Sequence, residues 1–296
     1  MRLYTRGNLY WLVQQSVLSG RRGLAAEEYL HTLNAAFAPI FWAFKDRAVV
    51  VDYGAPGAVD AYRLHYGPHY AYMAFQGLAM LPANLYRRIA NPGLVYHAVA
   101  AGPFPEIIGV VEAAAAHGVE RGHIDVSIFD IAVDTWRHAV EANISIARRL
   151  SPQIEIRVHY EQVDLYAAPP WLLAPADLVT MQNCLNEFCH DGVPGPAVMA
   201  FANAVNLGGG LVVTDLTKYD PTRRAVTALE ATLPAGGFLT LARFDPGHTE
   251  VTPFGHVPRD TFFHFYRFRK TSEDGAWEYD YPPKKNLNFS WSVWSR

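Results

Sequence analysis

From residue 91 onward, short apolar runs alternate with stretches of helical periodicity, and this alternation limits the possible folds more than any other feature of the sequence. A short apolar run predicts a buried strand, and the helix that follows it can cover one face of a sheet. We predict strands at 94–100, 124–129, 154–158, 177–181 and 211–214, and helices at 105–117, 134–149, 194–206 and 220–233. Repeated alternation of this kind predicts an open, mainly parallel α/β sheet.

The end of the predicted sheet lacks this alternation. Residues 238–244 and 261–268 both have the character of strands, and no clear helix separates them. Two strands joined without a crossover helix predict an antiparallel pair, so the last strand of the sheet is expected to be antiparallel. We expect residues 91–270 to form the core of the protein and residues 271–296, which are polar and aromatic, to form a tail packed on it.

The first 90 residues differ from the rest, because helices there are broken by irregular segments. Residues 25–44 are apolar at helical spacing but contain Pro39, and residues 60–81 carry aromatic side chains on most faces of the predicted helix. We expect Gly67 and Pro68 to break or kink this second helix. Residues 1–90 are therefore predicted to form a helical cap on the substrate side of the core.

Composition and charge exclude several classes of protein. Of the 296 residues, 50% are hydrophobic and 18% are charged, which suits a chain with a large core. The formal net charge of −3 lacks the basic excess of a protein whose main affinity is for a phosphate backbone. The two cysteines are too few for a disulfide framework or a four-thiolate metal site. No apolar run is long enough to span a membrane and no signal-peptide cleavage site is visible, so we expect a cytoplasmic protein.

Two of the predicted strands end in residues suited to a ligand. In open α/β sheets, ligands bind outside the carboxyl ends of the strands. The first strand ends in Ala100, Ala101 and Gly102, and a glycine there lets a ligand approach the backbone because no Cβ intervenes. The second strand ends in Asp130, whose carboxylate can accept hydrogen bonds from both hydroxyls of a ribose. Together these residues predict a cofactor that contains a nucleoside.

The same loop has few groups that can hold phosphate. A dinucleotide-binding loop has the pattern G-x-G-x-x-G, whose backbone N–H groups bind a pyrophosphate. Here Ala100 stands at the first glycine position, and Pro103 and Pro105 have no N–H to donate. The G-K-[ST] sequence of a P-loop does not occur. These features favour S-adenosylmethionine, which has a ribose and an adenine but no phosphate.

Several segments resemble the class I S-adenosylmethionine-dependent methyltransferases. Residues 100–106, with the sequence AAGPFPE, are similar to the G-x-G-P-x-P-E variant of the first motif of that family, with Ala100 in place of the usual glycine. The other similar segments are IFDI, VDL, ADLVTMQNCLNE, GGGLVVTD and the tyrosine-rich residues 62–82, which resemble a helical segment upstream of that motif. The resemblance covers residues 91–270 and implies a Rossmann-like, seven-stranded sheet whose last strand is antiparallel.

The resemblance also implies S-adenosyl-L-methionine as the cofactor and assigns residues to it. Those expected to bind the cofactor are Ala100, Ala101 and Gly102 along the methionyl part, Asp130 at the ribose with Ile131 beside it, Asp164 and Leu165 at the edge of the adenine, and Asn183 after the fourth strand. The predicted function is transfer of a methyl group to a small or medium organic acceptor by in-line displacement.

Residues on the acceptor side are less clearly marked in the sequence. A base is needed only if the acceptor must lose a proton, and the candidates are His65, His69 and Tyr66. The residues expected to contact the substrate are Tyr62, Tyr66 and Asp215.

No metal site is expected in this chain. His65 and His69 have the i, i+4 spacing of helical metal ligands, but the glycine–proline pair between them is expected to disrupt that geometry. Cys184 and Cys189 are interpreted as buried, unreactive thiols.

Alternative functions remain open. The slightly negative net charge and the aromatic cap favour a small-molecule acceptor, in a biosynthetic reaction, over nucleic acid. Whether the protein is a homodimer is left open. The alternatives are an RNA or protein methyltransferase with the same core, a relative that binds the cofactor without catalysis, and an NAD(P)-dependent oxidoreductase, which the two loop prolines disfavour. The sequence does not decide between oxygen, nitrogen and carbon as the methylated atom.

Overall fold

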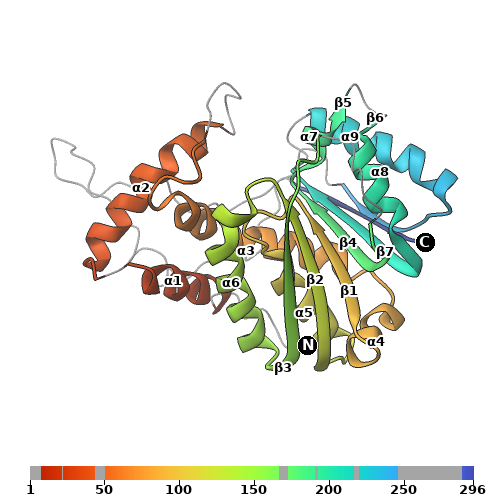
Figure 1. The fold of residues 1–296 in the computed structure, drawn as a ribbon, viewed down its shortest axis with the longest axis horizontal. Coiled ribbons are helices and arrows are strands. Elements are labelled where there is room, and N and C mark those ends of the chain that lie inside the picture. Colours follow the sequence, from red (N-terminus) through yellow and green to blue (C-terminus); the bar gives the residue numbers. More distant parts are fainter. Residues whose placement is uncertain are drawn as a thin grey trace.

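The computed structural model describes residues 8–21, 23–43, 51–166, 173–190, 193–216, 220–245 and 289–296, and its centre is a seven-stranded sheet. The strand order is β3-β2-β1-β4-β7-β9-β8 (Figure 1). The strands are β1 (Leu94–Val99), β2 (Arg121–Asp130), β3 (Gln153–Gln162), β4 (Ala176–Gln182), β7 (Val205–Asp215), β8 (Leu239–Phe244) and β9 (Ser290–Ser295). Neighbouring strands from β3 to β7 are parallel, whereas β9 is antiparallel to both β7 and β8. The predicted fold class, a mainly parallel Rossmann-like sheet with an antiparallel last strand, is confirmed.

Helices cover both faces of the sheet, and the central strands are accordingly apolar. All of β4 is buried, as expected for a parallel strand with helices on both sides. Along β1, Tyr96 and Ala98 pack into the core under α5, whereas Val99 packs into the core under α8. The helices on the first face are α4 (Ala83–Ala90), α5 (Glu106–Ala116) and α6 (Val133–Leu150), and those on the second are α7 (Leu185–Phe188), α8 (Pro196–Asn203) and α9 (Asp220–Thr232). The short elements are β5 (Cys189–His190), β6 (Val193–Pro194) and the 3₁₀ helix η1 (Leu233–Gly236).

The N-terminal helices α1 (Asn8–Ser19), α2 (Ala26–Ala43) and α3 (Ala58–Leu78) belong to the first face. Figure 1 shows α1 and α2 on the opposite side of the sheet from α8 and α9. The third helix joins them to the sheet, because α3 packs against α1, α2 and α5. Its contact with α5 is close at Gly109, where a Cβ would lie 2.8 Å from the backbone nitrogen of Phe75. Among the described residues, no helix combines the length and apolar character needed to cross a membrane.

Of the break or kink expected at Gly67 and Pro68, the break is wrong, because α3 is a single helix that contains Pro68, and the kink stays a prediction. A proline inside a helix removes one backbone hydrogen bond and crowds the preceding turn. Most of α3 is buried between neighbouring helices and the sheet, including residues on both sides of the proline. Tertiary packing supplies most of the stability of a helix in a protein, which explains why the local signal is overridden here.

The far edge of the sheet also differs from the expectation. Residues 239–244 form β8 as predicted, but the partner of β8 is β9, which belongs to the segment expected to be a tail. The predicted strand at 261–268 lies outside the described residues. The sequence SWSVWS of β9 is buried along most of its length, with Trp291 and Val293 in one core and Trp294 in the other. Strand β9 therefore completes the sheet between β7 and β8.

Candidate functional site

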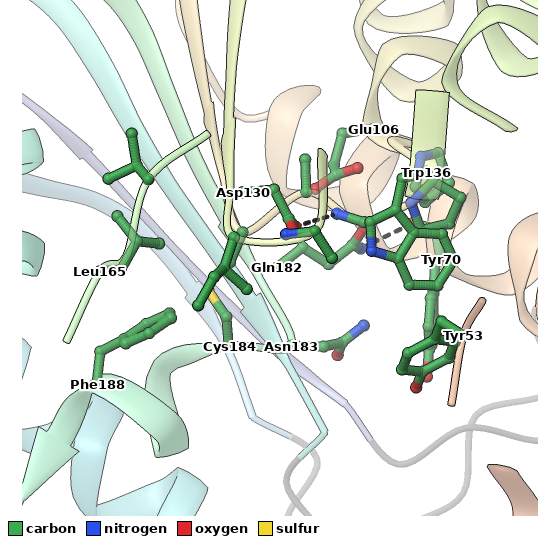
Figure 2. A pocket seen from close by; sticks show the side chains of 18 of the residues that line it. Tyr53, Tyr70, Glu106, Asp130, Trp136, Leu165, Gln182, Asn183, Cys184 and Phe188 are labelled. Carbon is green, nitrogen blue, oxygen red and sulfur yellow. Dashed lines mark hydrogen bonds between the residues drawn. The ribbon is translucent and has the colours of Figure 1, made fainter. Parts of the chain in front are cut away.

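A cavity of about 260 Å³ lies at the carboxyl ends of β1, β2 and β4. Figure 2 shows Leu165 and Phe188 at one side of this cavity and Trp136, Tyr70 and Tyr53 at the other, with Asp130 and Gln182 between them. We call the first side the apolar end, formed by Val163, Leu165, Cys184 and Phe188, and the second the aromatic end, formed by Tyr53, Tyr62, Tyr70 and Trp136. Open α/β sheets bind ligands at this position, outside the carboxyl ends of the strands.

The loop after β1 forms the floor of the cavity in an unusual backbone conformation. Ala100, Gly102 and Phe104 have φ angles of 49°, 51° and 58°, a region that side chains disfavour. Backbone hydrogen bonds hold the loop: Ala100 N donates to Phe129 O at 2.7 Å and Phe104 N donates to Ala101 O at 2.8 Å. Buried packing of the Phe104 ring compensates for its strained backbone. The result is a tight turn that exposes backbone to a ligand.

Asp130, at the end of β2, ties this loop to the neighbouring strand. Its Oδ2 accepts a hydrogen bond from Gly102 N at 3.0 Å, and its Oδ1 accepts one from Ala132 N at 2.8 Å. Burial raises the pKa of the Asp130 carboxyl, and these two hydrogen bonds oppose the rise. A carboxylate has about four lone-pair sites, so two remain for hydroxyl groups of a ligand.

Glu106 is a second carboxyl group in the cavity wall. It occupies the first turn of α5, is 1% exposed, and its Oε2 has no hydrogen-bond partner among the described residues. Burial raises the pKa of the Glu106 carboxyl from its ordinary value to about 8, and the nearby Asp130 carboxylate adds to the rise. A helix N-terminus favours a negative charge, but here the loss of water has the larger effect.

The apolar end is lined by buried apolar side chains, which form the water-poor surface that a nucleobase or another aromatic ring requires. Leu165 and Phe188 are buried, whereas Asp164 between Val163 and Leu165 is exposed. The Asp164 Oδ1 accepts a hydrogen bond from Tyr166 N at 2.9 Å, which fixes the turn after β3. This end can hold an apolar ring with a polar group at its outer edge.

The aromatic end is a cluster of rings from three parts of the chain. The ring centroid of Trp136 lies 4.7 Å from that of Tyr53 and 5.5 Å from that of Tyr62, and the Tyr62 and Tyr70 centroids are 6.1 Å apart. Burial raises the pKa of the Tyr62 and Tyr70 hydroxyls well above the ordinary value, so both stay neutral at physiological pH. The side-chain amide of Gln182 donates to Tyr70 O at 2.9 Å, which joins the centre of the cavity to this end.

All of the residues predicted to bind the cofactor line this one cavity. They are Ala100, Ala101, Gly102, Asp130, Ile131, Asp164, Leu165 and Asn183. Asn183 follows β4 with a φ angle of 56°, and its backbone N–H donates to Thr214 O at 2.9 Å. Tyr62, predicted to contact substrate, also lines the cavity. The role of each residue stays a prediction, but their convergence is a property of the fold.

The structure does not bring the other acceptor-side candidates to the cavity wall. His65 is 2% exposed, and its ring stacks on Phe37 with centroids 3.6 Å apart. His69 is fully buried in α3, and Tyr66 packs behind Tyr62 and Tyr70 with centroids 5.1 and 5.3 Å away. Asp215 ends β7 as expected, but it does not line the cavity either. These side chains have the environment of core residues.

The potential metal ligands of the described residues are dispersed. Among the described residues, no group of three or more His, Cys, Asp or Glu side chains is arranged to hold a metal ion. Cys184 is buried at the apolar end and Cys189 is half-buried, where burial raises the pKa of the Cys189 thiol. The expected burial is therefore confirmed for Cys184 but not for Cys189, and the low reactivity of both thiols stays a prediction.

Sequence reasoning missed most of the aromatic end. The residues not anticipated as part of the site include Tyr53, Tyr70, Glu106, Trp136, Gln182 and Phe188. The sequence did indicate Glu106, because a carboxylate follows the glycine loop directly, but an acidic residue in the first turn of a helix is common and does not by itself predict a site. Gln182 could also have been predicted, since it is the last residue of a buried strand. No sequence pattern indicates Tyr53, because its position depends on how the N-terminal helices pack.

Comparisons with known proteins show similarity at the level of solved structures. No protein-family model matches the chain, and no curated protein matches it. An O-methyltransferase family protein from Burkholderia thailandensis is 16% identical, with a TM-score of 0.44 over 91% of this chain and 70% of that chain. The plantazolicin methyltransferase BpumL in complex with SAH is 10% identical, with a TM-score of 0.41 over 92% of this chain and 99% of that chain. A putative RNA methyltransferase from Pyrococcus horikoshii is 13% identical, with a TM-score of 0.35 over 75% and 84%.

Proposed function

We propose that this protein is an S-adenosylmethionine-dependent methyltransferase. The observation that carries the proposal is the hydrogen bond from Gly102 N to Asp130 Oδ2, at 3.0 Å. It joins the loop after β1 to the carboxylate at the end of β2, so that both face one cavity. A backbone accessible to a ligand and a carboxylate with free lone pairs, on adjacent parallel strands, form a site for the ribose side of a nucleoside.

The residues of the cavity fit each part of this cofactor in turn. Leu165 and Phe188 would hold the adenine at the apolar end, Asp130 would accept the ribose hydroxyls, and Ala100 to Gly102 would lie along the methionyl part. The aromatic end would then face the sulfonium, because the faces of Tyr and Trp rings attract cations by about 0.5–2 kcal/mol. The apolar end, Asp130 and the aromatic end follow one another across the cavity (Figure 2), which supports the proposed succession of adenine, ribose and sulfonium.

A dinucleotide fits the same loop poorly. The N–H groups of Ala100, Gly102 and Phe104 already donate to Phe129 O, Asp130 and Ala101 O. Pro103 has no N–H at all, and neither has the proline that precedes α5. A pyrophosphate needs several free backbone donors, so an NAD(P)-dependent oxidoreductase is disfavoured on the geometry of the loop as well as on its sequence.

The chain's own part in the reaction is to position and to exclude water. The cofactor, when bound, supplies a methyl group on positively charged sulfur. A nucleophile attacks the methyl carbon in line with the carbon–sulfur bond, and the sulfur is the leaving group. Asp130 and the loop fix the ribose and the methionyl part, and Trp136 and Tyr70, both buried, close the reacting side against water. Holding two reactants in line in a desolvated site is itself a large source of rate enhancement. We propose that residues 1–90 form the substrate-side cap on the core, since α3 supplies Tyr62 and Tyr70, and that the acceptor is a small molecule.

Calorimetric titration tests the proposal directly. The purified protein is titrated with S-adenosylhomocysteine and, separately, with NADH, and transfer of a labelled methyl group from S-adenosylmethionine to fractionated cell extract is then followed. We expect S-adenosylhomocysteine to bind with one site per chain and NADH not to bind, with label in the small-molecule fraction. Binding of NADH alone would refute the proposal. Label in RNA or protein would support the alternative acceptor classes, and cofactor binding without any transfer would support a non-catalytic relative.

A further inference from the structure

Three oxygen atoms between the centre of the cavity and its aromatic end have no hydrogen-bond partner among the described residues. They are Glu106 Oε2, Gln182 Oε1 and Asn183 Oδ1. Glu106 is 1% exposed and Gln182 is 6% exposed, so water does not satisfy these two side chains freely. The orientation of the Gln182 amide is fixed, because its nitrogen donates to Tyr70 O and its oxygen must point the other way. A buried acceptor left unpaired costs about 1–3 kcal/mol, so a ligand with several N–H donors would remove this cost.

Aromatic faces lie at the same end of the cavity. Tyr53, Tyr62 and Trp136 form a compact group with centroids 4.7 to 5.9 Å apart. The Glu106 carboxyl is near enough to Tyr62 to raise the pKa of its hydroxyl, so the carboxyl and the rings share one environment. A buried carboxyl beside aromatic faces is the combination that recognises an ammonium ion.

The charges in the cavity wall favour the same ligand. Glu106, Asp130 and Asp164 line the cavity, and none of the described residues that line it is Lys, Arg or His. Asp130 is assigned to the ribose by its place at the end of β2, and Asp164 lies at the apolar end and is exposed. Glu106 is therefore the carboxyl left for the acceptor. An anionic acceptor would meet repulsion from the Asp130 carboxylate, whereas an ammonium ion would favour the ionised form of Glu106, whose pKa burial otherwise raises to about 8, so that Glu106 becomes its counter-ion.

We propose that the aromatic end binds an amine acceptor in its ammonium form, with Glu106 as counter-ion and base, so that the methyl group is transferred to nitrogen. This inference rests on the methyltransferase function proposed above and names its substrate class.

Each bond and proton is accounted for in this reaction. The Glu106 carboxylate takes one proton from the ammonium, which leaves a neutral amine with a free lone pair. The nitrogen–carbon bond forms as the sulfur–carbon bond breaks, and the electron pair of the broken bond stays on sulfur. The products are a methylated ammonium ion, a neutral thioether and a protonated Glu106, which then returns its proton to solvent. Burial favours this role, since the raised pKa of Glu106 brings it closer to the pKa of an amine.

The test compares amines with alcohols of matched size. The protein loaded with S-adenosylhomocysteine is titrated with butylamine and butanol, and with benzylamine and benzyl alcohol. We expect each amine to bind at least about tenfold more tightly than its alcohol, the range of a charge-assisted hydrogen bond. With S-adenosylmethionine and these compounds, the labelled methyl group is expected on nitrogen.

Two variants and one control assign the effect to residues. Glu106→Gln keeps the shape of the side chain but removes its charge, and it should reduce amine binding by about tenfold while affinity for S-adenosylhomocysteine changes by less than about threefold. Tyr53→Leu removes one ring and should weaken amine binding by about threefold with alcohol binding unchanged. Glu141→Gln changes an exposed carboxyl of α6 outside the cavity and should alter neither.

Several results would overturn the inference. These are equal binding of amines and alcohols, label on oxygen, no transfer to any amine by a protein that binds S-adenosylmethionine, and a Glu106→Gln variant that loses the cofactor but keeps its preference for amines. The last result would assign Glu106 to the cofactor's own amino group. If the wild-type protein binds no S-adenosylhomocysteine, the methyltransferase function itself fails, and the amine–alcohol comparison on the unloaded protein still tests the ammonium site.

Discussion

The two ends of the cavity are built in different ways. Toward the apolar end, the central elements are strand ends that backbone hydrogen bonds hold in place: the backbone N–H groups of Gly102 and Ala132 donate to the Asp130 carboxylate, and the backbone N–H of Asn183 donates to Thr214 O. The aromatic end is built from side chains of α3, of α6 and of the segment before α3, and the unpaired oxygens of Glu106, Gln182 and Asn183 lie between it and the centre of the cavity. A backbone-built site is suited to a fixed cofactor, whereas a side-chain-built site is suited to a specific acceptor. Substitutions at each end should therefore have separable effects.

The largest expected effect is that of Glu106, beside the aromatic end, on the pH dependence of the free energy of unfolding. Because the pKa of Glu106 is raised in the folded protein, the folded state binds its proton more tightly than the unfolded state does. The group's contribution to the unfolding free energy is thus complete at acid pH and is lost as the pH rises from 4.5 through about 8. At about 1.4 kcal/mol per pH unit, the complete loss is about 5 kcal/mol.

Urea denaturation of the ligand-free wild type and of Glu106→Gln, at about pH 5 and about pH 9, checks this. The variant should gain stability relative to the wild type as the pH rises, with the Glu141→Gln variant as the control for an exposed carboxyl. Asp130, Tyr62 and Tyr96 are the titratable groups near Glu106, and all three are retained in both proteins. Parallel pH profiles for wild type and Glu106→Gln would mean that the carboxyl is not desolvated.

The next effect tests the loop on the cofactor side. Gly102→Val places a branched side chain at a φ angle of 51°, in the space where the ligand should contact the backbone. We expect affinity for S-adenosylhomocysteine to fall by about 100-fold or more, equivalent to about 2.7 kcal/mol. Gly118→Val is the matched control, since Gly118 has a φ angle of 75° and lies after α5, away from the cavity. Loss of binding in both variants would point to general strain rather than to contact with the ligand.

A smaller effect is expected from the carboxylate at the end of β2. Asp130→Ala removes the acceptor for the ribose hydroxyls, and hydrogen bonds to a charged group are worth about 1.5–3 kcal/mol, so affinity should fall by about tenfold or more. Asp134→Ala, on the exposed first turn of α6, should bind as the wild type does. Calorimetric titration of both folded variants with S-adenosylhomocysteine measures these affinities. Unchanged affinity in Asp130→Ala would show that the ribose lies elsewhere.

The smallest effect is expected at the outer edge of the apolar end. Asp164 is exposed, and its carboxylate already accepts the Tyr166 N–H. Water competes for any further hydrogen bond there, so Asp164→Ala should weaken S-adenosylhomocysteine binding by only about two- to threefold. Calorimetric titration of this variant and of Asp130→Ala compares how much each carboxylate contributes to S-adenosylhomocysteine affinity. A larger loss of affinity in Asp164→Ala would mean that the ribose lies nearer Asp164 than Asp130.

The contrast between the two ends also explains what the sequence could predict. The cofactor side follows from a local rule, because the residue after each parallel strand must lie at one edge of the sheet, and Gly102, Asp130 and Asn183 were found in this way. The aromatic end depends on the packing of α3 against α5, which no local pattern specifies. The error at Pro68 has the same origin, since tertiary packing keeps a helix intact where local propensity predicts a break. The place of β9 was missed because strand pairing over long separations has no short-range signal.

A crystal structure of the protein with bound S-adenosylhomocysteine tests the central claim most directly. We expect the adenine between Leu165 and Phe188, the ribose hydroxyls within hydrogen-bond distance of the Asp130 carboxylate, and the sulfur directed toward the rings of the aromatic end. Ligand density in a different crevice, or an adenine placed among Tyr53, Tyr62 and Trp136, would contradict the assignment of the two ends.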